Sequence, residues 1–385
     1  MKKIGLIVCT LLFSSFVATT ASAEENAELA DDAKSAILIE RDTGAILYEK
    51  NIHEKLPPAS MTKIMTMLLI MEAIDKGQIQ LNEKVRTSEY AASMGGSQIF
   101  LEPGEEMTVK DLLKSIAIAS ANDASVALAE KIAGSEQAFV KMMNKKAAEL
   151  KLKNTKFQNT TGLSTDDHYS SAYDMAIMAK ELLKYEDITK FTKIYEDYLR
   201  EDTDKKFWLV NTNKLVKFYP GADGLKTGFT KEAKYCLTAT AKKDDMRVIA
   251  VIFGAQDPKG RNAQITSMMD YAFSQYKTHP FYKKGEKLAK IKVNKGHQND
   301  VHAVTSESIS VLTKKGQQFD KLKQEININK KQVAPIKKGD KVGTLIIKKG
   351  DKVLIESDLL AEKEIKKANW WQLYKKSLGM MTKSS

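Results

Sequence analysis

Hydrophobic residues follow two spacings along the first 280 residues, one typical of helices and one typical of strands. Apolar residues recur at helical spacing in four segments, 109–119, 124–133, 136–150 and 172–185. Strand-like runs lie on both sides of these segments, at 36–40, 45–49, 235–241 and 247–253, and a last helix is predicted at 261–276. Strands at both ends with helices between them favour one antiparallel sheet with helices packed on it, an α+β fold.

The segment 61–74 is apolar on nearly every side of the helix that it predicts. A helix of this kind belongs inside a domain, because none of its faces is suited to water. Pro57 and Pro58 break the chain just before it, and Lys63 interrupts its apolar surface. The burial expected for this helix therefore gives Lys63 an environment in which a charged ammonium is unfavourable.

The pattern changes after residue 280 into short alternating runs separated by Lys-Gly and Lys-Lys-Gly-Asp turns, which predicts a small β-rich domain at 281–357. The last segment, 358–385, is predicted to be an amphipathic helix. Trp371, Tyr374 and Leu378 fall at helical spacing in it, and lysines supply a cationic side. Tryptophans beside lysines suit an anionic membrane surface. The alternative is a helix docked on the β-rich domain.

The N-terminus has the layout of a secretory signal peptide. Lys2 and Lys3 precede an apolar run at 4–18, and the small residues of Ala21-Ser22-Ala23 form a cleavage site. A membrane anchor is the alternative, but the run is short for a span of about 20 residues. We therefore expect a signal at 1–23, a catalytic domain at 24–280, and an exported protein held peripherally at the outer face of the membrane or in the wall.

Net charge and the number of cysteines restrict the classes of partner and cofactor that the sequence predicts. The formal charge of +12 favours an anionic partner. Export removes nucleic acid from consideration and leaves anionic lipid or wall polymer. Cys236 is alone after signal removal and fits a buried strand thiol. The five histidines are scattered, without a His-Glu-x-x-His or paired-cysteine motif, so neither a metal nor another cofactor is predicted.

Three short motifs carry the candidate chemistry. Ser60 and Lys63 are three residues apart at a predicted helix start, so they share one face, and a buried lysine can lose its charge and act as a base for a serine. Ser120 and Asn122 lie in a loop between two predicted helices, where a helix cap is the plainer explanation. Lys226-Thr227-Gly228 precedes a strand and offers a cation, a hydroxyl and close backbone approach.

Each motif alone is weak, but the three in this order are typical of β-lactamases and penicillin-binding proteins. The chain resembles the low-molecular-mass penicillin-binding proteins that are serine D-Ala-D-Ala carboxypeptidases (peptidase family S11), most closely the type found in spore-forming bacilli. The resemblance is strong over 36–276 and includes four further stretches, 56–63, 95–97, 153–163 and 169–175. It implies a penicillin-binding, transpeptidase-like catalytic domain followed by an all-β domain and a terminal helix.

The resemblance also implies a role for each matching residue. Ser60 would be the acylated nucleophile and Lys63 the general base. Ser120 would relay protons and Asn122 would hold the substrate's peptide amide.

The remaining residues would bind the substrate. Lys226, Thr227 and, by a weaker match, Arg261 would meet its terminal carboxylate, with Gly228 allowing close approach. The backbone N–H groups of Ser60 and Phe229 would form the oxyanion hole. Relatives often have histidine at the position of Phe229. The implied partners are a wall stem peptide ending in D-Ala-D-Ala and β-lactams as inhibitors.

Three other functions stay open. A β-lactamase of the same fold is disfavoured, because no Glu-x-x-Leu-Asn signature lies between Asn122 and Lys226. A D,D-endopeptidase or transpeptidase would use the same acyl-enzyme. A non-catalytic protein that binds wall peptides would not need Ser60 and Lys63 together.

Overall fold

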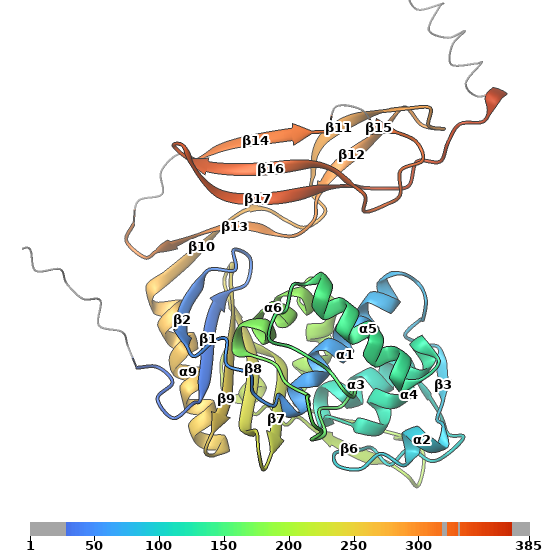
Figure 1. The fold of residues 1–385 in the computed structure, drawn as a ribbon, viewed down its shortest axis with the longest axis vertical. Helices are drawn as coiled ribbons and strands as arrows, with labels where there is room; N and C mark the ends of the chain where they lie inside the picture. The colour runs from blue at the N-terminus through green and yellow to red at the C-terminus, as the bar shows by residue number, and fades with distance from the viewer. Residues whose placement is uncertain (1–27, 318–321, 330–331, 372–385) are drawn as a thin grey trace, which may run out of the picture.

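A computed structural model describes residues 28–317, 322–329 and 332–371. The predicted signal peptide and the part of the predicted terminal helix from residue 372 onward lie outside the described residues. The described chain forms an α+β domain followed by a β-rich domain (Figure 1), as the sequence predicts.

The first domain is built on a five-stranded sheet in the order β2-β1-β9-β8-β7, with every neighbouring pair antiparallel. The N-terminal and C-terminal parts of the domain meet in this sheet, because β1 pairs with both β2 and β9. The strands are β1 (Ser35–Glu40), β2 (Ile46–Lys50), β7 (Ala222–Thr230), β8 (Lys234–Lys243) and β9 (Met246–Ala255).

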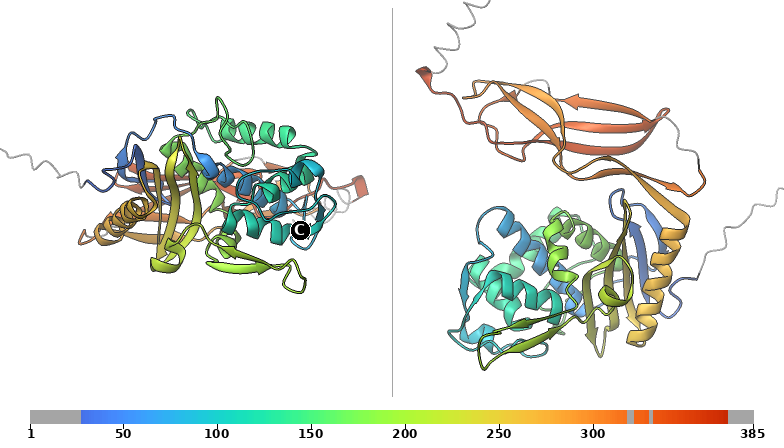
Figure 2. Two further views of the ribbon diagram at one scale, coloured as in Figure 1. Left: turned by 90° about the horizontal axis from the view of Figure 1, so that it is seen from below. Right: turned by 180° about the vertical axis from the view of Figure 1, so that it is seen from behind.

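Both faces of this sheet are covered. In β1, Ile37 and Ile39 point into the core shared with the helical region, while Ala36 and Leu38 point into the core under α9 (Pro258–Gln275). Seen from below (Figure 2, left), the sheet lies between α9 on one side and the remaining helices on the other. Alternate side chains are therefore buried on opposite faces, which explains why β1 reads as a nearly continuous apolar run.

The predicted buried helix is α1 (Lys63–Asp75), whose residues are buried from Lys63 to Ala73. It is preceded by a 3-10 turn, η1 (Ala59–Thr62). The other helices and short turns are α2 (Glu89–Ala92), α3 (Val109–Ala119), α4 (Asn122–Ala133), α5 (Glu136–Glu149), α6 (Ala172–Leu182), η2 (Glu186–Ile188), α7 (Thr189–Thr192) and α8 (Leu215–Phe218). Two small hairpins flank them: β3 (Lys84–Arg86) with β4 (Glu106–Thr108), and β5 (Glu196–Leu199) with β6 (Phe207–Val210).

Local capping fixes where two of the long helices begin. Thr108 accepts a hydrogen bond from the N–H of Asp111 at the start of α3, and Ser171 does the same for Asp174 at the start of α6. A side-chain oxygen at this position satisfies one of the N–H groups left without a partner at a helix start.

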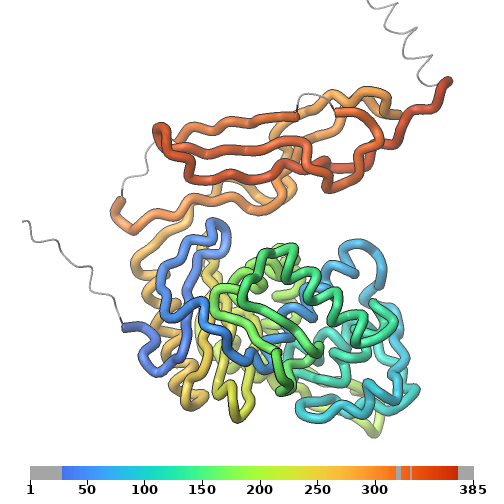
Figure 3. The backbone as a smooth tube through the Cα atoms, viewed as in Figure 1, coloured from blue at the N-terminus to red at the C-terminus, as the bar shows by residue number. Residues whose placement is uncertain are grey.

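The second domain begins where α9 passes directly into β10 (Tyr276–Tyr282) (Figure 3). The expected boundary at residue 280 falls inside this strand, which pairs with β13 (Ile309–Lys314). A six-stranded sheet follows, in the order β14-β16-β17-β12-β11-β15. Its strands are β11 (Lys287–Asn294), β12 (Asp300–Thr305), β14 (Lys323–Ile328), β15 (Gln332–Val333), β16 (Lys341–Lys349) and β17 (Lys352–Ala361).

The expectation of a helix from residue 358 is wrong for its first part. Leu359 and Ala361 lie in β17, where they pair with β12 and are buried in the core of the β-rich domain. Ile365 is also buried there and forms a bridge with Ile336. Helical structure begins at Trp370, the last part of the described chain. Leu359, Ala361 and Ile365 thus belong to the β core and not to a helix, whereas Tyr374 and Leu378 of the expected apolar face lie outside the described residues.

Candidate active site

Ser60 and Lys63 lie one turn apart where η1 passes into α1, so Ser60 sits in the 3-10 turn and not in the α-helix itself. The Lys63 side chain is fully buried. Its Nζ donates to Ser60 Oγ at 3.2 Å, to Asn122 Oδ1 at 2.6 Å and to the carbonyl oxygen of Thr161 at 2.7 Å. These three oxygens hold Nζ beside the Ser60 hydroxyl.

The surroundings of Lys63 favour its neutral form. Burial lowers the pKa of Lys63 well below its ordinary value, the charge of Lys226 lowers that pKa further, and Asp123 partly opposes both effects. A neutral amine has a lone pair that can accept the Ser60 proton. The arrangement can therefore activate a serine nucleophile without histidine.

Ser120 and Asn122 stand at the junction of α3 and α4, as expected for the second motif. Ser120 takes the left-handed conformation (φ 63°) that ends α3, and Asn122 is the first residue of α4. The buried Ser120 Oγ has no hydrogen-bond partner among the residues that the structure describes. The Asn122 side chain accepts from Lys63 and donates to the Gly95 carbonyl at 2.7 Å. One N–H of the amide remains for a substrate.

The third motif lies on β7, which packs directly on η1. A Cβ atom on Gly228 would lie 2.7 Å from the Pro58 carbonyl oxygen and 3.2 Å from the Ala59 Cβ. Such a contact is too close for an ordinary side chain, so glycine is what lets β7 approach the turn that carries Ser60. Thr227 Oγ1 donates to Thr212 Oγ1 at 2.7 Å, which orients the Thr227 hydroxyl.

Two further buried basic side chains, Lys226 and Arg261, come together beside Lys63 and this strand. Lys226 and Arg261 are 1% and 5% exposed, and Lys63 is fully buried. Burial and the neighbouring Arg261 charge lower the pKa of Lys226 to about 7. Within the described part of the chain none of the three forms an ion pair with a carboxylate: Lys226 donates to the Thr227 carbonyl, and Arg261 to the Asn262 side chain. Such a cluster is suited to an anionic ligand, because its charges otherwise lack compensation.

Phe229 follows this motif and is 52% exposed. Its ring stacks on that of Tyr235, with centroids 4.4 Å apart and an interplanar angle of 33°. The position therefore presents an aromatic side chain at the edge of the site.

The loop 159–168 supplies contacts that the sequence analysis did not assign. The Thr161 carbonyl accepts from Lys63, and a Cβ atom on Gly162 would lie 1.8 Å from the Ala59 carbonyl oxygen. His168 Nε2 lies 2.8 Å from the Oγ1 atom of Thr62, a residue that lies between Ser60 and Lys63 in the sequence. The polar run Asn159-Thr160-Thr161-Gly162 is the feature of the sequence that predicts a loop here.

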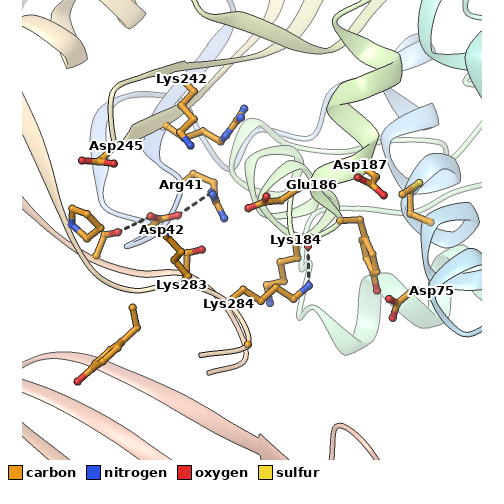
Figure 4. Close-up of a pocket in the computed structure, with 18 of the residues that line it drawn as sticks. Arg41, Asp42, Asp75, Lys184, Glu186, Asp187, Lys242, Asp245, Lys283 and Lys284 are labelled. Carbon is orange, nitrogen blue, oxygen red and sulfur yellow. Dashed lines mark hydrogen bonds and ion pairs between the residues drawn. The ribbon is translucent and has the colours of Figure 1, made fainter. Parts of the chain in front are cut away.

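Two cavities differ in their relation to these residues. A groove of about 440 Å³ adjoins the turn before Ser60 and is lined by 57–59, 162–169, Thr230 and Glu232. A cavity of about 800 Å³ lies at the junction of the two domains, lined by charged side chains of both signs, and contains none of the predicted site residues (Figure 4).

The described residues show no sign of a metal site or of a membrane-spanning helix. They contain no group of three or more His, Cys, Asp or Glu side chains placed to hold a metal ion. None of their helices combines the length and the apolar character that crossing a bilayer needs. The Cys236 thiol is buried in β8, as expected, and burial raises its pKa to about 11.

Comparisons with known proteins identify the family of both domains. The D-alanyl-D-alanine carboxypeptidase family model (peptidase S11) matches residues 19–257, and the penicillin-binding protein 5 C-terminal domain model matches 276–367. The D-alanyl-D-alanine carboxypeptidase DacF of Bacillus subtilis is 64% identical over 380 residues, covering 99% of this chain and 97% of the relative.

Solved structures show the same fold. Penicillin-binding protein 5 of Haemophilus influenzae has a TM-score of 0.67 at 29% identity, covering 87% of this chain and 98% of that one. The ampicillin-bound form of penicillin-binding protein D2 of Listeria monocytogenes has a TM-score of 0.54 at 30% identity, covering 63% of this chain and 98% of that one. From the family match and the similarity over nearly its whole length, the chain belongs to the S11 family of serine D-alanyl-D-alanine carboxypeptidases.

Proposed function

We propose that this carboxypeptidase removes the terminal D-alanine of wall pentapeptides through an acyl-enzyme on Ser60. The observation that carries the proposal is the 3.2 Å contact between Lys63 Nζ and Ser60 Oγ, made by a fully buried lysine whose pKa is lowered. A lysine of this kind is a base for the serine beside it.

In the first step, Ser60 Oγ forms a bond to the carbonyl carbon between the two D-alanines, and its proton passes to the Lys63 amine. The carbon–nitrogen bond then breaks, and the departing D-alanine takes a proton through Ser120. The buried Ser120 hydroxyl, without a hydrogen-bond partner among the described residues, is free to make such a relay. In the second step, water attacks the ester carbonyl: its OH becomes part of the new carboxyl group of the tetrapeptide, and its other proton goes to the departing Ser60 oxygen.

Recognition of the substrate rests on the cation cluster and on β7. Lys226, Thr227 and Arg261 bind the terminal carboxylate, which supplies the negative charge that the buried cations lack. The remaining N–H of the Asn122 amide holds the peptide carbonyl. The N–H groups of Ser60 and Phe229 stabilise the oxyanion, and Gly228 keeps their two backbone segments close.

The test is the intact mass of the protein, followed over time after addition of penicillin, with Ser60→Ala as the control. A long-lived adduct that requires Ser60 supports the acyl-enzyme. Release of free D-alanine from a soluble pentapeptide then separates hydrolysis from transpeptidation, which yields a cross-linked product. No adduct with hydrolysed drug indicates a β-lactamase, and no adduct with intact drug indicates a binding protein.

We further propose that residues 1–23 direct export and that the end of the chain rests on the outer face of the membrane. The sequence from residue 370 supports this, since Trp370 and Trp371 are followed by Lys375 and Lys376. Deletion of residues 370–385 leaves the β core intact and should release the protein from anionic lipid vesicles. Equal vesicle binding of the truncated and full chains contradicts the membrane contact.

A further inference from the structure

Asp123, the second residue of α4, is a carboxylate buried without a cation. It is 0% exposed, and among the described residues no basic side chain forms an ion pair with it. Its oxygens accept hydrogen bonds from three backbone N–H groups, those of Ile99 at 3.0 Å, Leu101 at 3.1 Å and Ala124 at 2.8 Å. A buried charge without a cation needs such donors, and two of the three come from another part of the chain.

The two distant donors lie on either side of Phe100, in the segment 95–101 that lies against the start of α4. Phe100 has φ +56°, a backbone conformation that is unfavourable for a residue other than glycine. Arg200 also holds this turn, because it donates to the carbonyl oxygen of Ile99 at 3.1 Å. The Asp123 carboxylate therefore stabilises a strained turn of the segment from its N–H side.

The same segment fixes the direction of the Asn122 amide. Its Nδ2 atom donates to the Gly95 carbonyl oxygen at 2.7 Å, and its Oδ1 atom accepts from Lys63 Nζ at 2.6 Å. The Asn122 backbone N–H donates to the Ser97 carbonyl oxygen at 2.7 Å. If the amide turned over, its oxygen would face the Gly95 carbonyl oxygen with no hydrogen between them. The position of Gly95 therefore keeps the amide oxygen toward Lys63.

We propose that Asp123 is a positioning residue of this site: by holding the segment 95–101 it keeps the Asn122 amide oriented toward Lys63 and the substrate. The inference rests on the proposed function and adds a residue outside the three motifs. A carboxylate suits this position because both of its oxygens accept and neither carries a proton. An asparagine there would turn an NH2 group toward backbone N–H groups, which cannot accept from it.

The Asp123 charge also acts on Lys63. Burial lowers the pKa of Lys63, and of the charged groups around it Lys226 on β7 lowers that pKa further while Asp123 on α4 raises it. Burial raises the pKa of Asp123 itself, and its backbone hydrogen bonds oppose that effect. Removal of the Asp123 charge should therefore lower the pKa of Lys63 further, so that its amine is neutral and able to act as a base at a lower pH.

The test measures the rate constant of penicillin labelling of Ser60 in the full-length protein, and the fraction of protein labelled, at a series of pH values. Asp123→Asn should lower the highest rate constant about tenfold or more, because a small displacement of a catalytic group is enough for such a loss. The pH below which the rate constant falls should become lower. Partial unfolding alone would reduce the labelled fraction and change neither the rate constant nor that pH.

Two further variants separate position from charge. A Cβ atom on Gly96 would lie 2.9 Å from Asn122 Nδ2, so Gly96→Ala displaces the amide and removes no charge. It should lower the rate constant and leave the pH of its fall unchanged. Asp123→Ser removes the charge but keeps one small acceptor oxygen, and it serves as a second substitution at this position if Asp123→Asn does not fold. It should lower both the rate constant and the pH of its fall.

Asp174→Asn is the matched control. Asp174 is also buried near a helix start, at 1% exposure, but its carboxylate accepts from the backbone N–H of Asn154 at 2.7 Å and not from the segment 95–101. Its substitution should lower the stability of the protein and leave the rate constant of labelling unchanged.

An unchanged highest rate constant in Asp123→Asn or Asp123→Ser, or an equal loss in Asp174→Asn, overturns the positioning role of Asp123. Normal labelling of the wild type leaves the proposed function standing in that case. Absence of labelling in the wild type overturns the proposed function itself.

Discussion

Lys63 shows how a single residue combines burial, charge and hydrogen bonding in the candidate site. Its three donors meet Ser60, Asn122 and Thr161, and no described carboxylate pairs with it. Lys63→Arg places a permanent positive charge at this position and cannot act as a base, because a guanidinium does not lose its proton in this pH range. We expect the rate of penicillin acylation to fall by at least about 100-fold.

The measurement is intact mass against time, with the thermal unfolding midpoint recorded in parallel. Lys146→Arg is the control, since Lys146 is also partly buried but pairs with Glu72 outside the site. Labelling of Lys63→Arg at the rate of the wild type removes the general-base role of Lys63.

Lys226 predicts a pH dependence. Because burial and Arg261 lower the pKa of Lys226 to about 7, this side chain is a cation below that pH and neutral above it. Binding of a carboxylate needs the cation, so kcat/KM for a pentapeptide should fall as pH rises through about 7. Arg261→Gln removes the neighbouring charge and raises the pKa of Lys226. The fall in kcat/KM should therefore occur at a higher pH in this variant.

The quantity to compare is the pH at which kcat/KM falls and not its absolute value, because Arg261→Gln also weakens binding at every pH. Lys259→Gln removes an exposed charge from the same helix and should leave that pH unchanged. If kcat/KM of Arg261→Gln falls at the same pH as that of the wild type, the pH dependence does not come from Lys226.

The residue scale also shows what the sequence could predict. Ser60, Lys63, Asn122 and Lys226 were predicted because their side chains occur in recognisable motifs, and the structure brings them together. The Thr161 carbonyl could not be predicted, since a backbone acceptor has no identity in sequence, and its segment lies 98 residues from Lys63.

At the scale of elements, close packing between the loop 159–168 and η1 holds the nucleophile in place. Gly162 has φ +83°, and an added Cβ atom would lie 1.8 Å from the Ala59 carbonyl oxygen and 2.9 Å from the Ser60 nitrogen. Gly162→Ala must therefore displace either the loop or the turn. We expect it to lower the free energy of unfolding by more than about 2 kcal/mol and to slow acylation.

Gly77→Ala is a close control. Gly77 also has a positive φ, +68°, but an added Cβ atom meets nothing within 4 Å. Gly77→Ala should therefore lower the free energy of unfolding only through backbone strain, by about 1 kcal/mol, and should leave acylation unchanged. Equal effects of the two substitutions on acylation contradict the packing argument.

The same loop predicts sensitivity to acid. The Gln158 N–H donates to His168 Nδ1, so the neutral ring carries its proton on Nε2 and donates to Thr62 Oγ1. Burial lowers the pKa of His168 from 6.5 to about 4. The unfolded chain therefore binds this proton more readily, and the stability that His168 contributes is complete above about pH 6.5 and is lost as pH falls toward about 4.

The full loss amounts to about 3 kcal/mol for a shift of this size. Urea unfolding of the wild type should show this decline between about pH 6.5 and about pH 4, and His168→Gln should flatten it. A decline of the same size in His168→Gln assigns the acid sensitivity to other groups.

Elements also show where a pattern misleads. The sheet and the long helices were predicted because each has enough residues for its period to be clear. The region around Leu359 was predicted as helix, yet its apolar residues pair with β12 and fill the β core. Tertiary pairing decided that segment, and a short apolar run does not carry this information.

At the scale of the whole molecule, the two domains have separate cores and meet through polar contacts and through Leu312 of β13, which packs against the first-domain core under α9. The core of the β-rich domain shares no residues with the two cores of the first domain. Asp42, in the β1–β2 turn, accepts from Ser310 Oγ at 2.7 Å, and Lys284 Nζ donates to the Lys184 carbonyl at 2.8 Å. The charged cavity of Figure 4 occupies the space between these contacts.

A polar junction of this kind couples two domains weakly. We expect two transitions in urea, one for each domain, with penicillin labelling lost in the transition of the first domain. Asp42→Ala removes the acceptor for Ser310 and should lower the midpoint of the second domain alone. Asp245→Asn is the control, since Asp245 lines the same cavity but is exposed. A single transition, reported alike by labelling and by the β-rich domain, shows instead that the junction makes one cooperative unit, because only strong coupling merges the unfolding of two cores.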